Sequence, residues 1–161
     1  MESTPVNLLE NVFDSKTKFV NEEGNEILLK DISFDVSEYI YIDLNNDKEN
    51  ELVLYEEKDN SYLVFYENRV EQKVYGFHLD TNSFLNIKTD GSFLRTFGET
   101  HNYISKLSFK ENRLVFEDLA VLNEDESVYY ILGKRTTKAL ADDFFVTWEE
   151  TTTHVNWNMV E

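Results

Sequence analysis

The pattern of apolar and polar residues predicts a series of short β-strands through most of the chain. Apolar or alternating runs follow one another at a spacing of about 8–12 residues, with Asp, Asn, Gly and Ser between them. Consecutive strands joined this tightly are usually neighbours in an antiparallel sheet. We expect strands at Tyr39–Asp43, Leu52–Glu56, Tyr62–Tyr66, Val70–His78, Leu85–Lys88, Phe93–Phe97, Tyr103–Phe109, Arg113–Leu119 and Val128–Leu132.

Each end of the chain predicts a helix. Near the start, Ser3 or Thr4 is placed to cap a short helix that has Pro5 in its first turn. Toward the end, Thr136 or Thr137 is placed to cap a second helix. The apolar positions at helical spacing are Val6, Leu9, Val12 and Phe13 in the first helix, and Leu140, Phe144 and Trp148, with Ala141 and Phe145 beside them, in the second.

Two further segments complete the expected fold. The apolar runs Lys18–Val20 and Ile27–Leu29 flank a loop that contains Gly24, which predicts a hairpin. The tail Val155–Val160 is either a final strand or a segment docked on the sheet. We expect a mainly β protein of the α+β type, an antiparallel meander, sandwich or barrel-like sheet with a short N-terminal helix and a C-terminal helix. A single domain over residues 1–161 is expected because no linker rich in Pro, Gly or Ser divides the chain.

Charge narrows the classes of partner. The chain has 32 Asp and Glu against 15 Lys and Arg, a formal net charge of −17. Such a field repels phosphate backbones and anionic membrane surfaces, so we expect no nucleic-acid binding. A basic protein or a divalent cation is electrostatically favoured, although the same charge also serves solubility alone. No apolar run approaches the roughly 20 residues of a membrane-spanning helix.

The segment from Asp43 to Glu51 carries the clearest chemical pattern. Its oxygen-bearing side chains occupy alternate positions of a loop between two predicted strands, and calcium takes six to eight oxygen ligands from tightly curled loops of this kind. The predicted ligands are the side chains of Asp43, Asn45, Asp47 and Glu51, with the backbone carbonyl of Glu49 completing the set.

Two interpretations of this loop stay open. Its layout resembles the D-x-D-x-D-G-x-x-D calcium loops of integrin-type propeller repeats, but Lys48 stands where those loops have Gly and Asn45 replaces an Asp. Position 12 is Leu54 rather than Glu, so the loop is not an EF-hand. The alternative to a calcium site is a polar hairpin turn in which the Asp and Asn side chains bond their own backbone.

No catalytic pattern is present, and we expect no enzyme. The chain has no Cys, no G-x-S-x-G elbow and no glycine-rich phosphate loop. Its three histidines, at positions 78, 101 and 154, lack the short spacings of zinc ligands. Carboxylates are so numerous that no catalytic pair stands out.

Several soft motifs resemble a group of uncharacterised β-rich domains from secreted or lipid-anchored proteins of clostridia-like Gram-positive bacteria. The motifs are Tyr41-Ile42-Asp43-Leu44-Asn45, Glu51-Leu52-Val53-Leu54, Lys73-Val74-Tyr75-Gly76-Phe77, Ile87-Lys88-Thr89-Asp90-Gly91-Ser92-Phe93 and Tyr129-Tyr130-Ile131-Leu132-Gly133-Lys134. Members typically carry a D-x-D-G-D-G loop, whose glycines are missing here. The resemblance implies a non-enzymatic module outside the cytoplasm.

Two hypotheses of function follow. The first is a binding or surface-associated module of an exported bacterial protein, with a structural calcium loop. The second is an acidic inhibitor or immunity protein that neutralises a basic toxin or another basic protein. The first segment, Met1–Pro5, lacks the features of a signal peptide, so an extracytoplasmic location implies a leader outside this sequence, and the alternative is the cytoplasm.

Overall fold

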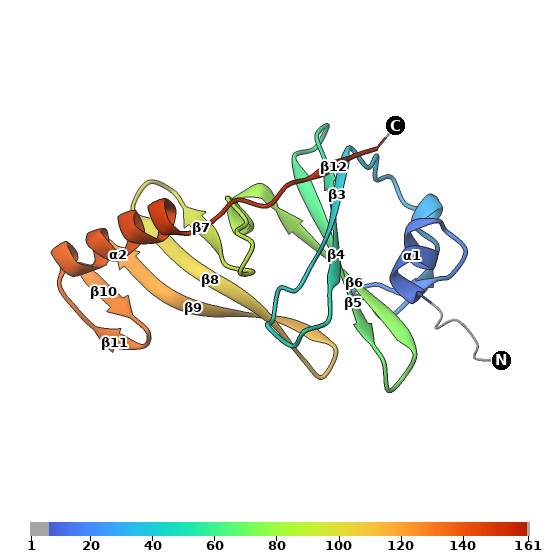
Figure 1. Cartoon of the computed structure of the whole chain (residues 1–161), viewed down its shortest axis with the longest axis horizontal. Helices are drawn as coiled ribbons and strands as arrows, with labels where there is room; N and C mark the ends of the chain where they lie inside the picture. Colours follow the sequence, from blue (N-terminus) through green and yellow to red (C-terminus); the bar gives the residue numbers. More distant parts are fainter. Residues whose placement is uncertain (1–6, 161) are drawn as a thin grey trace.

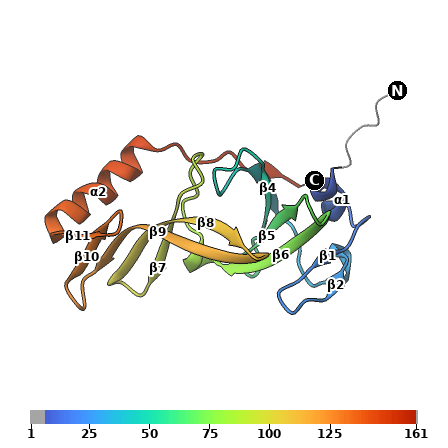
Figure 2. The same ribbon diagram turned by 90° about the horizontal axis from the view of Figure 1, so that it is seen from below.

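The protein is elongated, with two β-sheets arranged along its long axis and a helix near each end (Figures 1 and 2). The structure is a computed structural model that describes residues 7–160. Over these residues both sheets are open rather than closed into a barrel, and most strands follow one another as meanders. The expected mainly β, α+β fold class with two terminal helices is confirmed.

The first sheet has seven strands in the order β12-β3-β4-β5-β6-β1-β2. The expected hairpin pairs β1 with β2, and the run from β3 to β6 is a meander because tight polar turns join its strands. A parallel contact of β1 with β6 and the edge strand β12 complete the sheet. The bounds are β1 Phe19–Val20, β2 Glu26–Ile27, β3 Glu38–Ile42, β4 Glu51–Glu56, β5 Ser61–Asn68, β6 Lys73–Asp80 and β12 Asn158–Met159.

The second sheet has five strands in consecutive order, β7 to β11. Their bounds are β7 Phe93–Phe97, β8 His101–Lys110, β9 Arg113–Asn123, β10 Val128–Ile131 and β11 Lys134–Arg135. The expected strand at Leu85–Lys88 is wrong, since Leu85 and Lys88 form isolated bridges to Leu94 and His154. A tight turn causes this, because the Lys88 N–H donates to the Ser92 carbonyl and the chain reverses there.

The helices are short and capped by side chains. Asn7 caps α1 (Leu8–Phe13) by accepting a hydrogen bond from the Glu10 N–H, whereas the expected caps Ser3 and Thr4 lie outside the described residues. Thr137 caps α2 (Lys138–Thr151) as expected. The remaining helical turns are the 3-10 segments η1 (Leu29–Asp31) and η2 (Thr81–Ser83).

The central strand β4 of the first sheet is buried on both faces because a different layer covers each. Leu52 and Leu54 of β4 pack into a cluster with α1, while Val53 between them joins a cluster that includes Leu107 of the second sheet. The tip of the β8–β9 hairpin reaches this junction, where Phe109 stacks on Tyr66 with ring centroids 4.4 Å apart. Figure 1 shows the hairpin extending from the second sheet to the first. Period-2 alternation therefore sends successive β4 side chains into two cores.

Within residues 7–160, no helix is both long enough and apolar enough to cross a membrane. The longer of the two α-helices, α2, has 14 residues and packs against β9 and β10. The expected absence of a helical membrane span therefore holds for the part of the chain that the structure describes.

Candidate functional site: an acidic loop beside a groove

The Asp43–Glu51 loop connects β3 to β4, two antiparallel neighbours that pair at Ile42 and Glu51. A buried strand on each side holds the two ends of the loop. Gly91 lies close against the start of the loop, because a Cβ at this position would lie 2.9 Å from the carbonyl oxygens of both Asp43 and Leu44. The segment after the η2 turn thus packs against the start of the loop.

Backbone N–H groups of the loop point toward the carboxylate of Asp43, so the loop curls around this side chain. Its two oxygens accept hydrogen bonds from the Asp47 N–H at 3.2 Å and the Lys48 N–H at 2.8 Å. Asp47 in turn accepts from the Glu49 N–H at 2.8 Å. Lys48 has a φ of +70°, the left-handed conformation that the glycine of a calcium loop adopts at this position. The self-bonding expected of a polar turn is therefore present.

The same curl brings three of the predicted ligands together. Asp43, Asp47 and Glu51 each offer a carboxylate oxygen, and these oxygens all lie within 4.8 Å of one another. Two oxygens bound to one calcium at 2.3–2.6 Å are separated by about 5 Å at most, so this cluster has the dimensions of a calcium site. Self-bonding does not preclude coordination, because each carboxylate oxygen has a second lone pair.

The other two predicted ligands behave differently. The Asn45 amide donates to Asp47 at 3.1 Å, and its Oδ1 is buried without a hydrogen-bond partner. An unpaired buried acceptor on a side chain that contacts Asp47 fits a cation. The Glu49 side chain pairs instead with Arg69 at 2.5 Å, and its proposed ligand, the backbone carbonyl, remains a prediction.

Glu51 is the one carboxyl group of the cluster that is removed from water. It is 2% exposed and accepts a hydrogen bond from the Leu44 N–H at 3.0 Å. Burial raises its pKa to about 8, and the carboxylates of Asp47 and Asp43 add to the shift. Without a cation, this group is therefore largely protonated at neutral pH.

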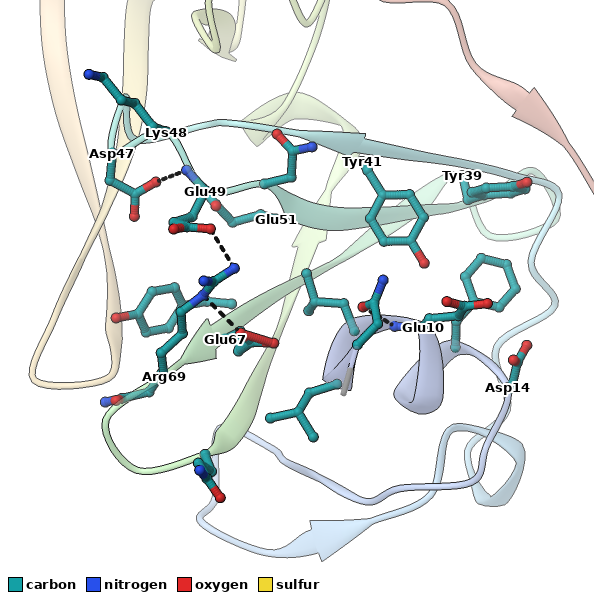
Figure 3. A pocket seen from close by; sticks show the side chains of 18 of the residues that line it. Glu10, Asp14, Tyr39, Tyr41, Asp47, Lys48, Glu49, Glu51, Glu67 and Arg69 are labelled. Carbon is teal, nitrogen blue, oxygen red and sulfur yellow. Dashed lines mark hydrogen bonds and ion pairs between the residues drawn. The ribbon is translucent and has the colours of Figure 1, made fainter. Parts of the chain in front are cut away.

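A wide groove of about 1690 Å³ opens beside the loop, between the loop, β3, α1 and the turn after β5 (Figure 3). Its lining includes Tyr39, Tyr41 and Tyr66 together with two basic residues, Lys48 and Arg69. Burial, assisted by nearby carboxylates on α1, raises the pKa of the Tyr41 hydroxyl to about 12. Six carboxyl groups line the groove: Glu10, Asp14, Asp47, Glu49, Glu51 and Glu67.

Sequence reasoning missed the groove because its acidic residues come from three separate elements. Glu10 and Asp14 belong to α1 and its C-cap, Glu67 belongs to β5, and the rest belong to the loop. In a chain with 32 acidic residues, no local signal separates these six from the others. Only the packing of α1 against β5 and β6 brings them to one place.

Comparison of this chain with models of protein families, with curated proteins and with solved structures found no match.

Proposed function

We propose that this chain is a non-enzymatic binding module of an exported bacterial protein, and that its Asp43–Glu51 loop binds calcium. The observation that carries the calcium site is the convergence of the Asp43, Asp47 and Glu51 carboxylates within 4.8 Å. The location and the module character rest on the resemblance of motifs such as the one around Tyr41–Asn45 to secreted β-rich domains.

The donor set suits a hard cation. All the offered atoms are oxygens, and hard cations such as calcium prefer carboxylate and carbonyl oxygens. Asp43, Asp47, Glu51 and the Asn45 Oδ1 would hold the ion. Bound calcium would supply charge neutralisation at the β3–β4 junction, which gives it a structural role. The Lys48 side chain extends away from Asp47 and Glu49 (Figure 3).

Calorimetric titration with calcium tests the site directly. We expect measurable heat and a rise in melting temperature at about 1–5 mM calcium, because a ligand that binds the folded state stabilises it. Asp47→Asn removes a predicted ligand and should weaken binding at least about tenfold. Asp59→Asn is the matched control, an exposed Asp in the next turn, between β4 and β5, and should bind as the wild type does. The absence of both heat and a rise in melting temperature would contradict the proposed calcium site.

Substitution of Lys48 supplies a second readout of the same site. Lys48→Gly removes both the left-handed strain and a positive charge, and Lys48→Gln removes the charge alone. We expect both variants to tighten calcium binding by a similar factor, because each removes one positive charge beside the ligands. Only Lys48→Gly should also raise the melting temperature without calcium above that of Lys48→Gln, because a non-Gly residue in this conformation costs roughly 1 kcal/mol. Unchanged calcium affinity in both variants would show that the Lys48 charge does not act on the site.

A second candidate function is an acidic inhibitor of a basic protein. The specific observation in its favour is the concentration of six carboxyl groups in one groove, on a chain with a net charge of −17. A salt-sensitive complex with a basic protein in the absence of calcium distinguishes it from the first candidate.

A further inference from the structure

We propose that the groove between α1, β3 and the Asp43–Glu51 loop is the docking site for an extended basic segment of a partner protein that carries apolar anchor residues. This inference deepens the proposed binding function and names the class of partner, but it does not depend on calcium. Charge, exposed apolar side chains and size support it independently.

The negative charge of the groove favours the binding of positively charged groups. Six carboxyl groups, of which Glu51 is largely protonated when no cation is bound, face two basic side chains there, and one of the two, Arg69, is already engaged. Its guanidinium bridges Glu49 at 2.5 Å and Glu67 at 3.2 Å, from the loop and from β5. Arg69 thus shows which group this surface accepts, since a planar guanidinium pairs well with carboxylates. Glu10 and Asp14 on the opposite wall have no cationic partner among the described residues.

Exposed apolar side chains gather at the same groove. Val70 is 96% exposed, Met159 is 70% exposed and Val160 is 39% exposed, and all three line it. Val70 comes from the β5–β6 turn, whereas Met159 and Val160 are neighbours at the end of the chain, so two distant segments contribute exposed apolar side chains to one groove. Apolar side chains that stay exposed together beside charged groups are typical of protein-interaction surfaces.

The size and the aromatic lining of the groove favour a polypeptide over a small molecule. Small-molecule pockets usually enclose about 300–1,000 Å³, and this groove is larger and open. Tyr39, Tyr41 and Tyr66 offer rings and hydroxyls along it. Tyrosine is enriched at protein interfaces because it combines a large contact area with a polar end, and its ring also attracts cations.

Binding of designed peptides to the full chain tests the proposal. The probe is a fluorescent peptide of about twelve residues in which Arg and Leu alternate, which spans about 40 Å when extended. The control peptide alternates Glu and Leu. Both are measured by anisotropy in EDTA, so that calcium plays no part. We expect the Arg peptide to bind, the Glu peptide not to bind, and the affinity to fall as salt rises from about 0.05 to 0.5 M.

Two triple variants locate the binding. Glu10→Gln/Asp14→Asn/Glu67→Gln neutralises three groove carboxylates outside the calcium ligands and should weaken the Arg peptide at least about tenfold. The matched control makes the same charge change at exposed residues on the second sheet and α2, as Glu117→Gln/Glu126→Gln/Glu150→Gln, and should weaken binding by about twofold or less. Equal weakening by both variants, or no binding of the Arg peptide, would overturn the proposal.

Methyl NMR of the wild-type protein gives a test that needs no variant. The Arg peptide should shift the methyl signals of Val70, Met159 and Val160, which line the groove. The methyl groups of Leu132, Leu140 and Val146, which are 53–66% exposed, lie elsewhere and should not move. Shifts confined to the second set would overturn the proposal. Shifts of the groove methyls on dilution without peptide would do so too, because they would assign the surface to a second copy of the chain.

Failure of this proposal and failure of the calcium site are distinguishable. The peptide experiments are made in EDTA with the calcium ligands intact, and the calorimetry is made without peptide. Calcium binding without binding of the Arg peptide would contradict the docking proposal and support the calcium site. Peptide binding without calcium binding would contradict the calcium site and support the docking proposal.

Discussion

At the scale of single residues, backbone conformation decides how closely the loop resembles a calcium site. Lys48 lies in the left-handed region at φ +70°, and Asn46 lies there at φ +63°. Asn adopts this conformation with little strain, whereas a residue such as Lys is rarely found in it. The carboxylate of Asp43 holds Lys48 there through its hydrogen bond to the Lys48 N–H. A side-chain hydrogen bond thus stabilises, at Lys48, the left-handed conformation that a glycine would adopt without strain.

Substitution of Gly91 should show that the loop depends on close backbone contact. A Cβ at Gly91 meets two carbonyl oxygens at 2.9 Å, while a Cβ at Gly24 meets nothing within 4 Å. Their φ values are nearly equal, +88° and +86°, so conformational strain is matched. We expect Gly24→Ala to cost about 1 kcal/mol and Gly91→Ala to cost at least about 2 kcal/mol in urea denaturation. Equal costs would contradict the contact.

The buried Glu51 carboxyl predicts a pH dependence of stability. Its pKa of about 8 in the folded protein lies above the ordinary value of 4.5 that it regains on unfolding. The folded state therefore binds more protons, and this contribution is complete below pH 4.5 and disappears as pH rises through about 8. In EDTA, the free energy of unfolding should fall over that range, by at most about 5 kcal/mol from this group.

Glu51→Gln should remove this pH dependence, because a neutral amide keeps the acceptor for the Leu44 N–H and has no proton to lose. Urea denaturation at several pH values should show the variant more stable than the wild type near pH 9. The exposed control Glu117→Gln should keep the wild-type slope. A common slope for all three proteins would show that Glu51 ionises normally.

At the scale of elements, strand and helix faces are assigned by what packs against them. The apolar positions of β8 do not alternate regularly, because Ile104 and Leu107 lie on opposite faces of the strand and both are buried. The register with β9 shifts between Ile104 and Ser105, where Leu119 of β9 is the extra residue. Ile104 packs toward α2, while Leu107 packs toward the first sheet. One long hairpin therefore contributes to two cores.

The α2 helix gives a direct test of this assignment. Leu140 and Trp148 share the predicted apolar face, but Leu140 is 59% exposed and Trp148 is 8% exposed. Trp148 also donates its indole N–H to Ser92 at 2.8 Å. We expect Trp148→Ala to cost about 3–5 kcal/mol in chemical denaturation and Leu140→Ala less than about 0.5 kcal/mol. Similar losses would mean that Leu140 is buried in solution.

At the scale of the whole molecule, the charge is the dominant property. A net charge of −17 on 161 residues repels itself in the compact state more than in the expanded unfolded chain. The exposed ion pairs contribute little against this, since pairs of this kind are worth about 0–1 kcal/mol each. The packing of β8 and β9 against the first sheet must therefore hold the elongated molecule together despite the repulsion.

Salt should consequently stabilise this protein. We expect the melting temperature to rise as NaCl increases from about 0.05 to 0.5 M, because screening weakens the self-repulsion. The control variant with Glu117, Glu126 and Glu150 neutralised should show a smaller rise, since it carries less charge. A melting temperature that falls with salt would show that local ion pairs outweigh the net charge.

The sequence by itself determined the fold class, the meander order of most strands, the terminal helices and the position of the acidic loop. These properties are local: alternation, turn residues, helix caps and the spacing of Asp43, Asp47 and Glu51 need only near neighbours. The strand expected at Leu85–Lys88 was wrong because a local turn outweighed its apolar pattern.

The tertiary structure alone decided the division into two sheets, the parallel contact of β1 with β6, the exposure of Leu140 and the groove. Each of these depends on contacts between segments far apart in the chain, whose energies no local pattern reports. The burial of Glu51, and with it the raised pKa, has the same origin. The spacing of the predicted calcium ligands can therefore be predicted from the sequence. The surface proposed for the partner forms only when folding brings α1, β5 and the end of the chain together.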